Sequence, residues 1–455
     1  MQQSAPKIRI VPPTENFNSN HETINLLHAY GNMCKQRQCF VTGVVALKRA
    51  LALAPDDPDL LCDLGALLWN YADYKGAYTV LKKSLHLRPT AVAHCNMGLT
   101  LASMGRFLTA RDHHIEALKI HPEYMGSRWN LALLDLGMGN WERGLEEYEC
   151  RMEYRGEVQY PKLPYPVWKG EDLNGKTIFV HGEQGIGDRI LFSRYLAWLK
   201  NTYPDCTILH ATIDECKRLM WDYRKIVQFV DPETPYRDIP ADYHIFLLSL
   251  PRLAKSTPTN VPPDPGYIRS RVEPDKDLVI AFRDGGPLNP RQKSLKVGVR
   301  WSGNSYNEAN DDRKIPFEFL LELAENPDVT LYSLQVGEGS ERLTQLGAEN
   351  ICVNVGNAMA SKGYIGSAMV MLHLDLVVTT CTSVAHLAGA MGIPTWVLLS
   401  SNPYWVWGNQ GRTAPWYPSV RLYRQPSPGD WISVLEKVKS DLRALSQEYV
   451  KSRVR

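Results

Sequence analysis

Two stretches of this sequence combine acidic or hydroxyl side chains with glycines in patterns that suit catalysis and anion binding. The first, HGEQGIGD, spans residues 181–188 and places Glu183 and Asp188 among three glycines. The second, TSVAHLAGAMGIP, spans residues 382–394 and begins with two hydroxyl side chains. A carboxylate in such a loop could accept a proton as a general base, and hydroxyls beside backbone N–H groups could hold a phosphate.

Each stretch lies between an expected strand and an expected helix. The apolar run at 178–180 precedes the first stretch, and apolar residues at helical spacing follow it from residue 190. The second follows an expected strand at 376–378 and a turn at 379–382, and it contains a helix at 383–391. In a parallel sheet such loops gather at the carboxyl edge, where ligands bind.

Both stretches also have a purely structural interpretation. Glycines can serve only to let a helix and a strand pack closely, and Asp188, Thr382 or Ser383 can be helix N-caps. His386 falls one turn into the second helix, where it is either a packing residue or part of the same pocket.

Composition describes an ordinary globular protein of about two to four domains. The 455 residues carry a net charge of +2 and are 44% hydrophobic, so nothing attracts the whole chain to nucleic acid. The longest apolar runs, such as residues 395–400, are too short to span a membrane, and the polar tail at 1–20 lacks a signal-peptide core. Nine cysteines without a Cys-x-x-Cys pair indicate a reducing cytoplasm.

The region at 21–157 repeats itself about four times. A dipeptide ending in glycine recurs 34 and then 33 residues apart, at 30–31, 64–65 and 97–98, and prolines close three units. The period resembles the tetratricopeptide repeat, in which two antiparallel helices cross closely at small residues. Stacked repeats form a curved solenoid, which either binds a protein or peptide partner or only braces the next domain.

Beyond the repeats, the pattern changes to alternating strands and helices. A proline-rich linker at 158–176 leads to a first α/β domain at 177–290 and a second at 291–424, before a C-terminal segment at 425–455 with a helix near 431–445. Short apolar runs at 207–211, 243–248 and 395–399 are among the expected strands. Such alternation favours parallel sheets.

These motifs, together with VGVRWSGN at 297–304, resemble a family of bacterial and phage glycosyltransferases with N-terminal tetratricopeptide repeats. That family is similar to the heptosyltransferases and, more distantly, to the O-GlcNAc transferases. The resemblance covers nearly the whole chain from residue 24. It implies a GT-B fold, in which two Rossmann-like domains face each other across a cleft and the C-terminal helix packs back on the first. The predicted fold class is therefore α + α/β, a repeat solenoid followed by GT-B.

The resemblance also implies roles for individual residues. Asp188 matches an aspartate proposed as the general base. The predicted nucleotide-sugar-binding residues are Gly185, Gly187, Trp301, Ser302, Gly303, Asn304, Arg313, Lys314, Gln335, Cys381, Thr382, Ser383 and His386. Related sequences often have aspartate where this chain has Cys381, which puts any hydrogen bond made by that carboxylate in doubt.

The function implied is glycosyl transfer from a nucleotide-diphosphate sugar to a hydroxyl of a protein or glycan, with inversion. No convincing Asp-x-Asp motif is present, so we expect no metal and no other cofactor, with helix N–H groups and Arg313 or Lys314 stabilising the leaving diphosphate. Expected partners are the donor and an acceptor held by the repeats, without nucleic acid or a membrane span. The alternatives are a repeat scaffold with an inactive glycosyltransferase domain and, less favoured, a nucleotide-sugar hydrolase or phosphorylase-like enzyme.

Overall fold

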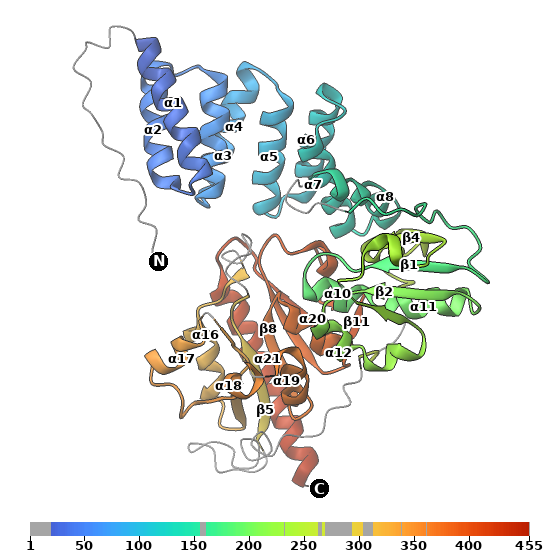
Figure 1. Ribbon diagram of the computed structural model, residues 1–455. Coiled ribbons are helices and arrows are strands. Elements are labelled where there is room, and N and C mark those ends of the chain that lie inside the picture. Colours follow the sequence, from blue (N-terminus) through green and yellow to red (C-terminus); the bar gives the residue numbers. More distant parts are fainter. Residues whose placement is uncertain are drawn as a thin grey trace, which may run out of the picture. The chain divides into compact units, whose positions relative to one another are not determined.

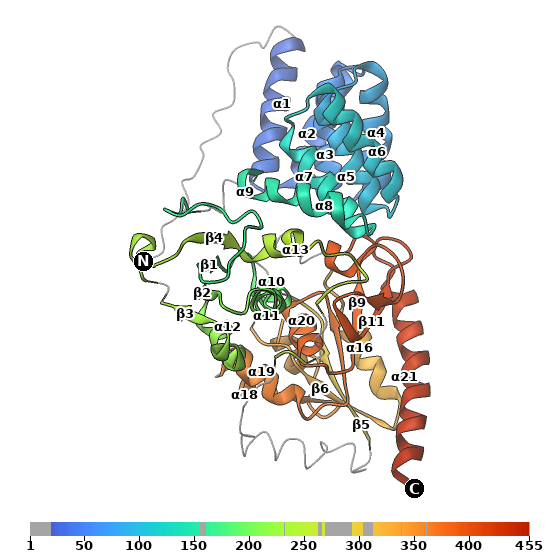
Figure 2. The same ribbon diagram turned by 90° about the vertical axis from the view of Figure 1, so that its right-hand side faces the viewer.

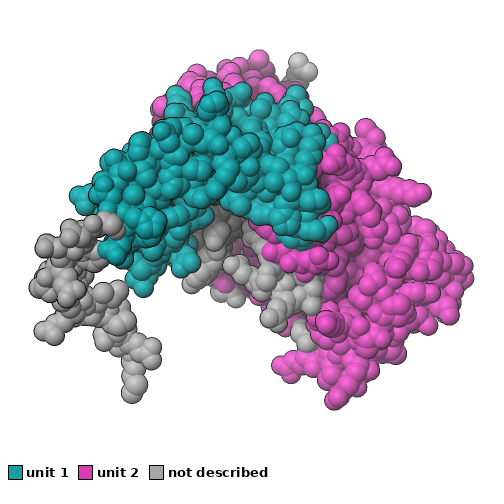
Figure 3. Space-filling view, turned by 90° about the horizontal axis from the view of Figure 1, so that it is seen from above, with its two compact units in different colours: residues 1–127 teal, residues 128–455 magenta. Residues whose placement is uncertain are grey.

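The computed structural model describes residues 20–154, 161–231, 233–262, 266–268, 294–303, 313–337, 339–360 and 362–454. The chain divides into two compact units, residues 1–127 and 128–455, coloured teal and magenta in Figure 3. Nearly all of the predicted tail at 1–20, the start of the linker at 158–176, the predicted boundary at 290/291 and Asn304 lie outside the described residues.

Helical hairpins make up the described part of the first unit (Figure 1). The helices are α1 (Asn20–Gln36), α2 (Phe40–Leu53), α3 (Pro58–Asn70), α4 (Tyr74–Leu87), α5 (Ala91–Ser103) and α6 (Phe107–Ile120). The repeated glycine lies where the helices of a hairpin cross, because a Cβ on Gly65 would lie 2.4 Å from Cγ of Leu81. Gly31 and Gly98 are similarly close to the second helix of their own hairpins. The predicted helical solenoid is confirmed, and its period follows from this close approach.

The last helices of the predicted repeat region pack into the core of the second unit. They are α7 (Met125–Gly137), α8 (Trp141–Glu147), the 3₁₀ turn η1 (Tyr148–Cys150) and α9 (Arg151–Tyr154). The Trp141 ring stacks on Trp416 with centroids 4.7 Å apart, and Tyr148 meets Trp405 edge-on at 5.9 Å. These aromatic side chains belong to one buried cluster, so the segment from α7 to α9, which we call the fourth helical pair, is an integral part of that core.

A parallel sheet of four strands forms the first α/β layer of the second unit. Its strands are β1 (Thr177–His181), β2 (Thr207–Ala211), β3 (Gln228–Val230) and β4 (Tyr243–Phe246), in the order β3-β2-β1-β4. The helices between them are α10 (Ile186–Phe192), α11 (Arg194–Thr202) and α12 (Asp214–Leu219), with a 3₁₀ turn, η2 (Trp221–Lys225). The strand expected at 243–248 ends two residues early, where the chain turns into η4 (Leu247–Ser249) and α13 (Leu250–Leu253).

A larger sheet of seven strands forms the second α/β layer. Its strands are β5 (Leu295–Arg300), β6 (Val329–Ser333), β7 (Cys352–Asn354), β8 (Leu376–Thr380), β9 (Thr395–Leu399), β10 (Thr413–Ala414) and β11 (Tyr417–Arg424). The order is β10-β11-β9-β8-β5-β6-β7, and every pairing except β10 with β11 is parallel. The parallel strands thus follow the 3-2-1-4-5-6 order of a Rossmann-like domain, with its switch point between β5 and β8. The predicted fold class is confirmed.

Short helices connect these strands, and one long helix ends the chain. They are α16 (Phe317–Leu321), η5 (Glu322–Glu325), α17 (Glu341–Gln345), α18 (Gly356–Ala360), α19 (Gly363–Met371), α20 (Ser383–Ala390), η6 (Trp405–Trp407) and α21 (Trp431–Val454). Within the described ranges, none of the helices is both long enough and apolar enough to cross a lipid bilayer.

The C-terminal helix does not pack as predicted. We expected it to return to the first Rossmann-like domain, but α21 lies beside β11 and α16 of the second (Figure 2). Its apolar residues Val434, Val438 and Leu442 join the core formed by β5, β6 and β8. Tyr449 also donates a hydrogen bond to Asp375 at 3.1 Å, just before β8. The apolar stripe of α21 therefore completes its own domain.

Candidate active site

Asp188 lies in the first turn of α10 and accepts hydrogen bonds on both carboxylate oxygens. Gly185 is the N-cap of this helix, and its N–H donates to Oδ2 of Asp188 at 3.2 Å. The hydroxyl of Tyr404, which is 216 residues away in the chain, donates to Oδ1 at 2.9 Å. One oxygen therefore makes the helix-capping contact of the structural alternative, while the other contacts a side chain from the second sheet's domain.

The surroundings of Asp188 suit a general base. Burial raises the pKa of its carboxyl to about 6, and this effect exceeds the lowering by the hydrogen bonds from Tyr404 and Gly185. A carboxyl with this pKa is mostly ionised at neutral pH, yet more basic than an ordinary aspartate. A proton acceptor works best when its pKa lies near the working pH.

Thr382 and Ser383 lie at the start of α20, after the carboxyl end of β8. Thr382 occupies the N-cap position, but its side chain makes no capping hydrogen bond and lies 3.4 Å from the Thr379 hydroxyl. The Ser383 hydroxyl lies 2.6 Å from that of Tyr364. Because neither hydroxyl caps the helix, N-capping does not explain why Thr382 is there. Both positions remain predicted phosphate contacts.

The two predicted groups of site residues meet where α10 packs against α20. A Cβ added to Gly187 would lie 2.9 Å from Cδ2 of His386 and 3.4 Å from Cα of Ser383. A larger residue at 187 would therefore separate the helices. The glycine that precedes Asp188 thus brings the carboxylate loop to the first turn of α20, as both the packing and the functional interpretations require.

His386 is a packing residue in this structure. Its ring is buried, stacks on Trp407 with centroids 4.8 Å apart, and places Nδ1 3.2 Å from the Tyr417 hydroxyl. Burial, with a smaller effect of the Arg194 cation, lowers the pKa of His386 to about 3. The imidazole is therefore neutral at physiological pH and unsuited to proton transfer there.

Cys381 lies where the family resemblance led us to expect an aspartate. Its thiol is buried, which raises its pKa, and Sγ accepts the Trp407 indole N–H at 3.1 Å. Arg313 donates from Nη1 to the Cys381 backbone carbonyl at 3.0 Å. Any residue at position 381 would present that carbonyl. The substitution therefore leaves this contact of Arg313 intact, although the site lacks a carboxylate there.

The loops after β5 and β6 are joined by a pair of buried polar side chains. Gln335 accepts the Ser302 N–H at 3.2 Å through Oε1 and donates from Nε2 to the Ser302 hydroxyl at 3.0 Å. Trp301 is buried against Phe317, with ring centroids 4.1 Å apart, so its side chain belongs to the core. The remaining predicted residues of this region are partly or fully exposed, namely Gly303 and Lys314.

Arg300 is a site-forming residue that the sequence did not single out. Its guanidinium donates from Nε to the Ser302 carbonyl at 3.1 Å and from Nη1 to the Leu334 carbonyl at 3.2 Å. It therefore ties together the ends of β5 and β6 at the edge where Rossmann-like domains bind ligands. The available signal was its place inside VGVRWSGN, directly before the predicted loop.

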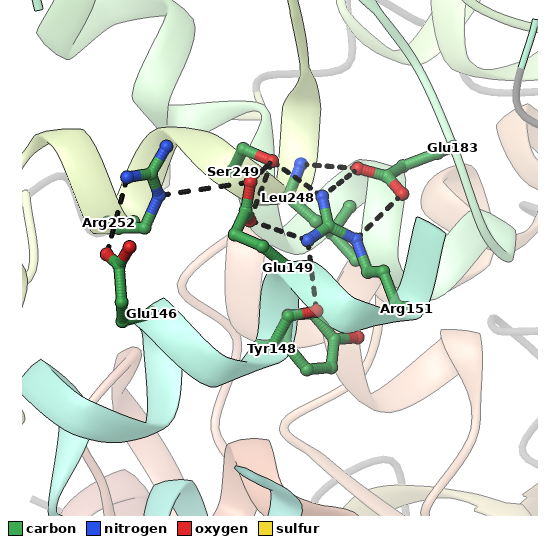
Figure 4. A network of polar contacts seen from close by, with 8 residues as sticks. All are labelled: Glu146, Tyr148, Glu149, Arg151, Glu183, Leu248, Ser249 and Arg252. Atoms are coloured by element: carbon green, nitrogen blue, oxygen red, sulfur yellow. Dashed lines mark hydrogen bonds and ion pairs between the residues drawn. The ribbon is translucent and has the colours of Figure 1, made fainter. Parts of the chain in front are cut away.

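Glu183, the second acid of the glycine loop, has a structural partner. Arg151 of α9 donates from Nε and Nη2 to the two Glu183 oxygens at 3.1 and 2.9 Å, and Leu248 donates its N–H to one of them at 3.0 Å. Arg151 also donates to the Ser249 hydroxyl at 2.7 Å and to Glu149 at 2.7 Å. Figure 4 shows this network of charged side chains around the guanidinium. It anchors the loop that leads to Asp188.

Comparisons with known proteins give limited similarity. No known protein-family profile matches the sequence. Protein FlbA of Caulobacter vibrioides is 25% identical over 426 residues, which cover 88% of this chain and 69% of FlbA. A glycosyl transferase family 9 structure from Veillonella parvula is 13% identical with a TM-score of 0.40, covering 61% of this chain and 99% of its own. A mutant O-GlcNAc transferase from Thermobaculum terrenum is 14% identical with a TM-score of 0.35, covering 96% and 94%. At such TM-scores the similarities establish no common fold, and the fold assignment rests on the elements described above.

Proposed function

We propose that this chain is a glycosyltransferase that moves a sugar from a nucleotide-diphosphate sugar to a hydroxyl of a protein or glycan acceptor. One observation carries the proposal. The first turn of α10, which carries Asp188 with a carboxyl pKa of about 6, packs through Gly187 directly against the start of α20, where Thr382 and Ser383 lie. The proposed proton acceptor and the proposed anion-binding helix start thereby lie close together at the carboxyl edges of two parallel sheets.

The proposed reaction is a single displacement with inversion. The acceptor oxygen attacks the anomeric carbon while the bond from that carbon to the donor phosphate breaks. The electron pair leaves with the nucleoside diphosphate, and the acceptor proton passes to the Asp188 carboxylate. Backbone N–H groups of α20, the hydroxyls of Thr382 and Ser383, and the Arg313 cation stabilise the negative charge that develops on the leaving group.

Replacing both hydroxyls at the start of α20 is expected to weaken diphosphate binding. Hydrogen bonds to a charged group are worth about 1.5–3 kcal/mol each, so Thr382→Ala with Ser383→Ala should raise the Kd at least about tenfold. A thermal-shift panel of ADP, GDP, UDP, CDP and dTDP selects the ligand, and calorimetry measures its affinity in each variant.

A matched control exists at the opposite edge of the same sheet. Ser294 and Thr330 form a buried hydroxyl pair, 2.6 Å apart, before β5 and at the start of β6. Their double alanine variant loses the same two groups and should bind the diphosphate normally. Equal affinity in the Thr382/Ser383 variant and the parent would reject this phosphate site.

Transfer is expected to need no divalent metal. The motivation is the lack of a convincing Asp-x-Asp motif in the sequence, together with the cationic and N–H groups available to the leaving diphosphate. Dialysis against excess EDTA should leave the rate unchanged, and added Mg²⁺ or Mn²⁺ should not raise it. Complete loss of transfer in EDTA, restored by either ion, would contradict this expectation.

The helical repeats are expected to hold the acceptor. Because the core of the second unit includes α8, a shortened chain should begin at Met125, the first residue of α7, and keep this core intact. Its transfer to a macromolecular acceptor should fall at least about tenfold if the lost surface contributed even 1.4 kcal/mol to binding. Hydrolysis of the donor by the same shortened chain is the control, and its melting curve verifies folding. Equal transfer by both chains would show that the repeats only brace the catalytic unit.

An inactive domain on a repeat scaffold is the second candidate, and Cys381 is the observation in its favour. A buried neutral thiol cannot replace a carboxylate that binds the substrate or orients a cation. Replacing Asp188 distinguishes the two candidates, because the change can lower the rate of sugar transfer only if the domain is an active enzyme.

A further inference from the structure

Tyr404 connects Asp188 to the fourth helical pair. It lies after β9 and directly before the first residue of η6. Its hydroxyl donates to Oδ1 of Asp188 at 2.9 Å. The Tyr404 ring meets Trp405 edge-on with centroids 5.9 Å apart, and Trp405 in turn meets Tyr148 of η1 edge-on at 5.9 Å.

The carboxylate of Asp188 is held by two donors from separate elements. Gly185 fixes Oδ2 from the start of the same helix, and Tyr404 fixes Oδ1 from a different α/β domain. Two donors on two oxygens define the plane of the carboxylate, whereas the Gly185 contact alone would let it rotate about χ2. The orientation of the group therefore depends on Tyr404.

Tyr148 is itself rigidly placed. Its side chain is buried, its ring lies under the Arg151 guanidinium at 5.0 Å, and its backbone carbonyl accepts an Arg151 N–H at 3.3 Å. The ion pair between Arg151 and Glu183 then returns to the loop that carries Asp188. The fourth helical pair is thus connected to the site twice, through the loop and through the aromatic contacts from Tyr148 by way of Trp405 to Tyr404.

We propose that Tyr404 is the positioning residue of the catalytic carboxylate, packed through Trp405 against Tyr148 of the fourth helical pair. This inference rests on the proposed function, since it gives Asp188 the role of base. Tyr404 does not touch the reacting atoms. It keeps one lone-pair direction of Oδ1 occupied and presents the others to the acceptor hydroxyl, and it stabilises the ionised form that must accept the proton.

Among the groups around Asp188, the Tyr404 hydroxyl has a large effect on the pKa of the carboxyl. Six titratable groups of the described residues interact electrostatically with Asp188. They come from the glycine loop, α10, η1 and the segments around β8, η6 and β11, and they are Glu183, Arg189, Tyr148, Tyr404, Cys381 and Tyr417. Burial keeps the three tyrosines and the thiol protonated at neutral pH. Glu183, which would raise the pKa of Asp188, is paired with Arg151. Of the effects that lower this pKa, the Tyr404 hydrogen bond is the largest.

The first test is the pH dependence of transfer by Tyr404→Phe. Removing the hydroxyl should raise the pKa of Asp188, so the acid limb of kcat/KM should move to higher pH by about one unit. The kcat at neutral pH should fall while the KM for the donor stays near the parental value. Tyr423→Phe is the matched control, because the buried Tyr423 donates a similar 2.8 Å hydrogen bond to Asp441 elsewhere in the same domain. It should leave the profile unchanged.

The second test measures proton binding without any reaction. The free energy of unfolding is followed against pH for the parent, Asp188→Asn, Tyr404→Phe and the double variant. The Asp188 carboxyl binds its proton more tightly in the folded state, with a pKa of about 6 against an ordinary 3.8, so its contribution to stability declines as the pH rises between these values. In Tyr404→Phe the decline should extend to higher pH. It should be absent from Asp188→Asn, both alone and combined with Tyr404→Phe, because the amide does not titrate.

The outcomes separate the two levels of the proposal. An unchanged stability profile and an unchanged acid limb in Tyr404→Phe would refute the positioning role. A shifted stability profile with an unchanged acid limb would refute Asp188 as the base, whereas the absence of any transfer by the parent would refute the proposed function. Should Tyr404→Phe fail to fold, Tyr404→Leu provides the measurement, because it also removes the hydroxyl and should shift both profiles in the same direction.

Discussion

Asp188→Asn is expected to lower the rate of transfer by about 10²-fold or more, while the nucleoside diphosphate still binds normally. The amide has nearly the shape of the carboxylate and can accept the Gly185 N–H, but it cannot take a proton at neutral pH. A lost general base costs a factor of about 10²–10⁴ in rate. Rates measured under saturating donor, together with calorimetry of the diphosphate, test this expectation.

Stability provides the control for the same variant. A helix cap alone would cost about 0.5–2 kcal/mol when weakened. Because the folded-state pKa of Asp188 is raised, its charge destabilises the fold above about pH 6, and the neutral amide removes that charge. We therefore expect Asp188→Asn to be at least as stable as the parent at pH 7.5 and relatively less stable near pH 4. An asparagine variant that transfers sugar at the parental rate would end the assignment of Asp188 as the base.

The parent enzyme should lose activity in acid for the same reason. Only the ionised carboxylate accepts the acceptor proton, so kcat/KM should fall about tenfold per pH unit below the pKa near 6. If kcat/KM stayed constant down to pH 4.5, this result would contradict a base with this pKa.

The regular elements were predictable because their signals are local. The strands predicted at 207–211 and 395–399 coincide with β2 and β9, since a short apolar run bounded by polar residues has few other ways to be buried. The repeated glycines were equally informative, because each one contacts a side chain about sixteen residues away, as Gly65 contacts Leu81. The period of the sequence repeats therefore indicates such short-range contacts directly.

The partners of the site residues were not predictable in this way. Tyr404 meets Asp188 across 216 residues and Arg151 meets Glu183 across 32, and neither pair has a spacing that a single sequence reveals. The prediction for α21 was wrong for the same reason, because an apolar stripe does not by itself identify the domain against which a helix packs. Motif resemblance, in turn, does not distinguish ligand contacts from packing, and the predicted contacts Trp301 and His386 both have buried rings.

One useful clue did lie in the sequence around Tyr404. The stretch NPYWVW at 402–407 places aromatic residues directly after an expected strand of a parallel sheet. Loops at the carboxyl edge line the ligand site of such folds, so a tyrosine there is a candidate hydrogen-bond donor. What the sequence could not specify was which side chain of the other domain it would meet.

Arg151→Ala should destabilise the protein more than any other single change discussed here. The guanidinium is almost fully buried, as is Glu183, with side-chain exposures of 1% and 3%. Each of its five N–H groups has an acceptor, from Glu183, Ser249, Tyr148 and Glu149. Its loss would leave the Glu183 carboxylate buried without its cation, which costs about 3–5 kcal/mol. Urea unfolding measures this difference in the free energy of unfolding, provided that the parent and the variant have the same m value.

Another arginine of the same network supplies the control. Arg252 pairs with Glu146 at 3.3 Å and with Glu149 at 3.8 Å, and its own side chain is 25% exposed while that of Glu146 is 68% exposed. Exposed ion pairs contribute about 0–1 kcal/mol, so Arg252→Ala should change the free energy of unfolding only slightly. Restoring neutrality with Glu183→Gln in the Arg151→Ala background should recover part of the lost stability, because the unpaired charge is removed. If Arg151→Ala unfolds at the same urea concentration as Arg252→Ala, the ion pair does not hold the Asp188 loop, and the fourth helical pair must be retained in the core by its aromatic contacts alone.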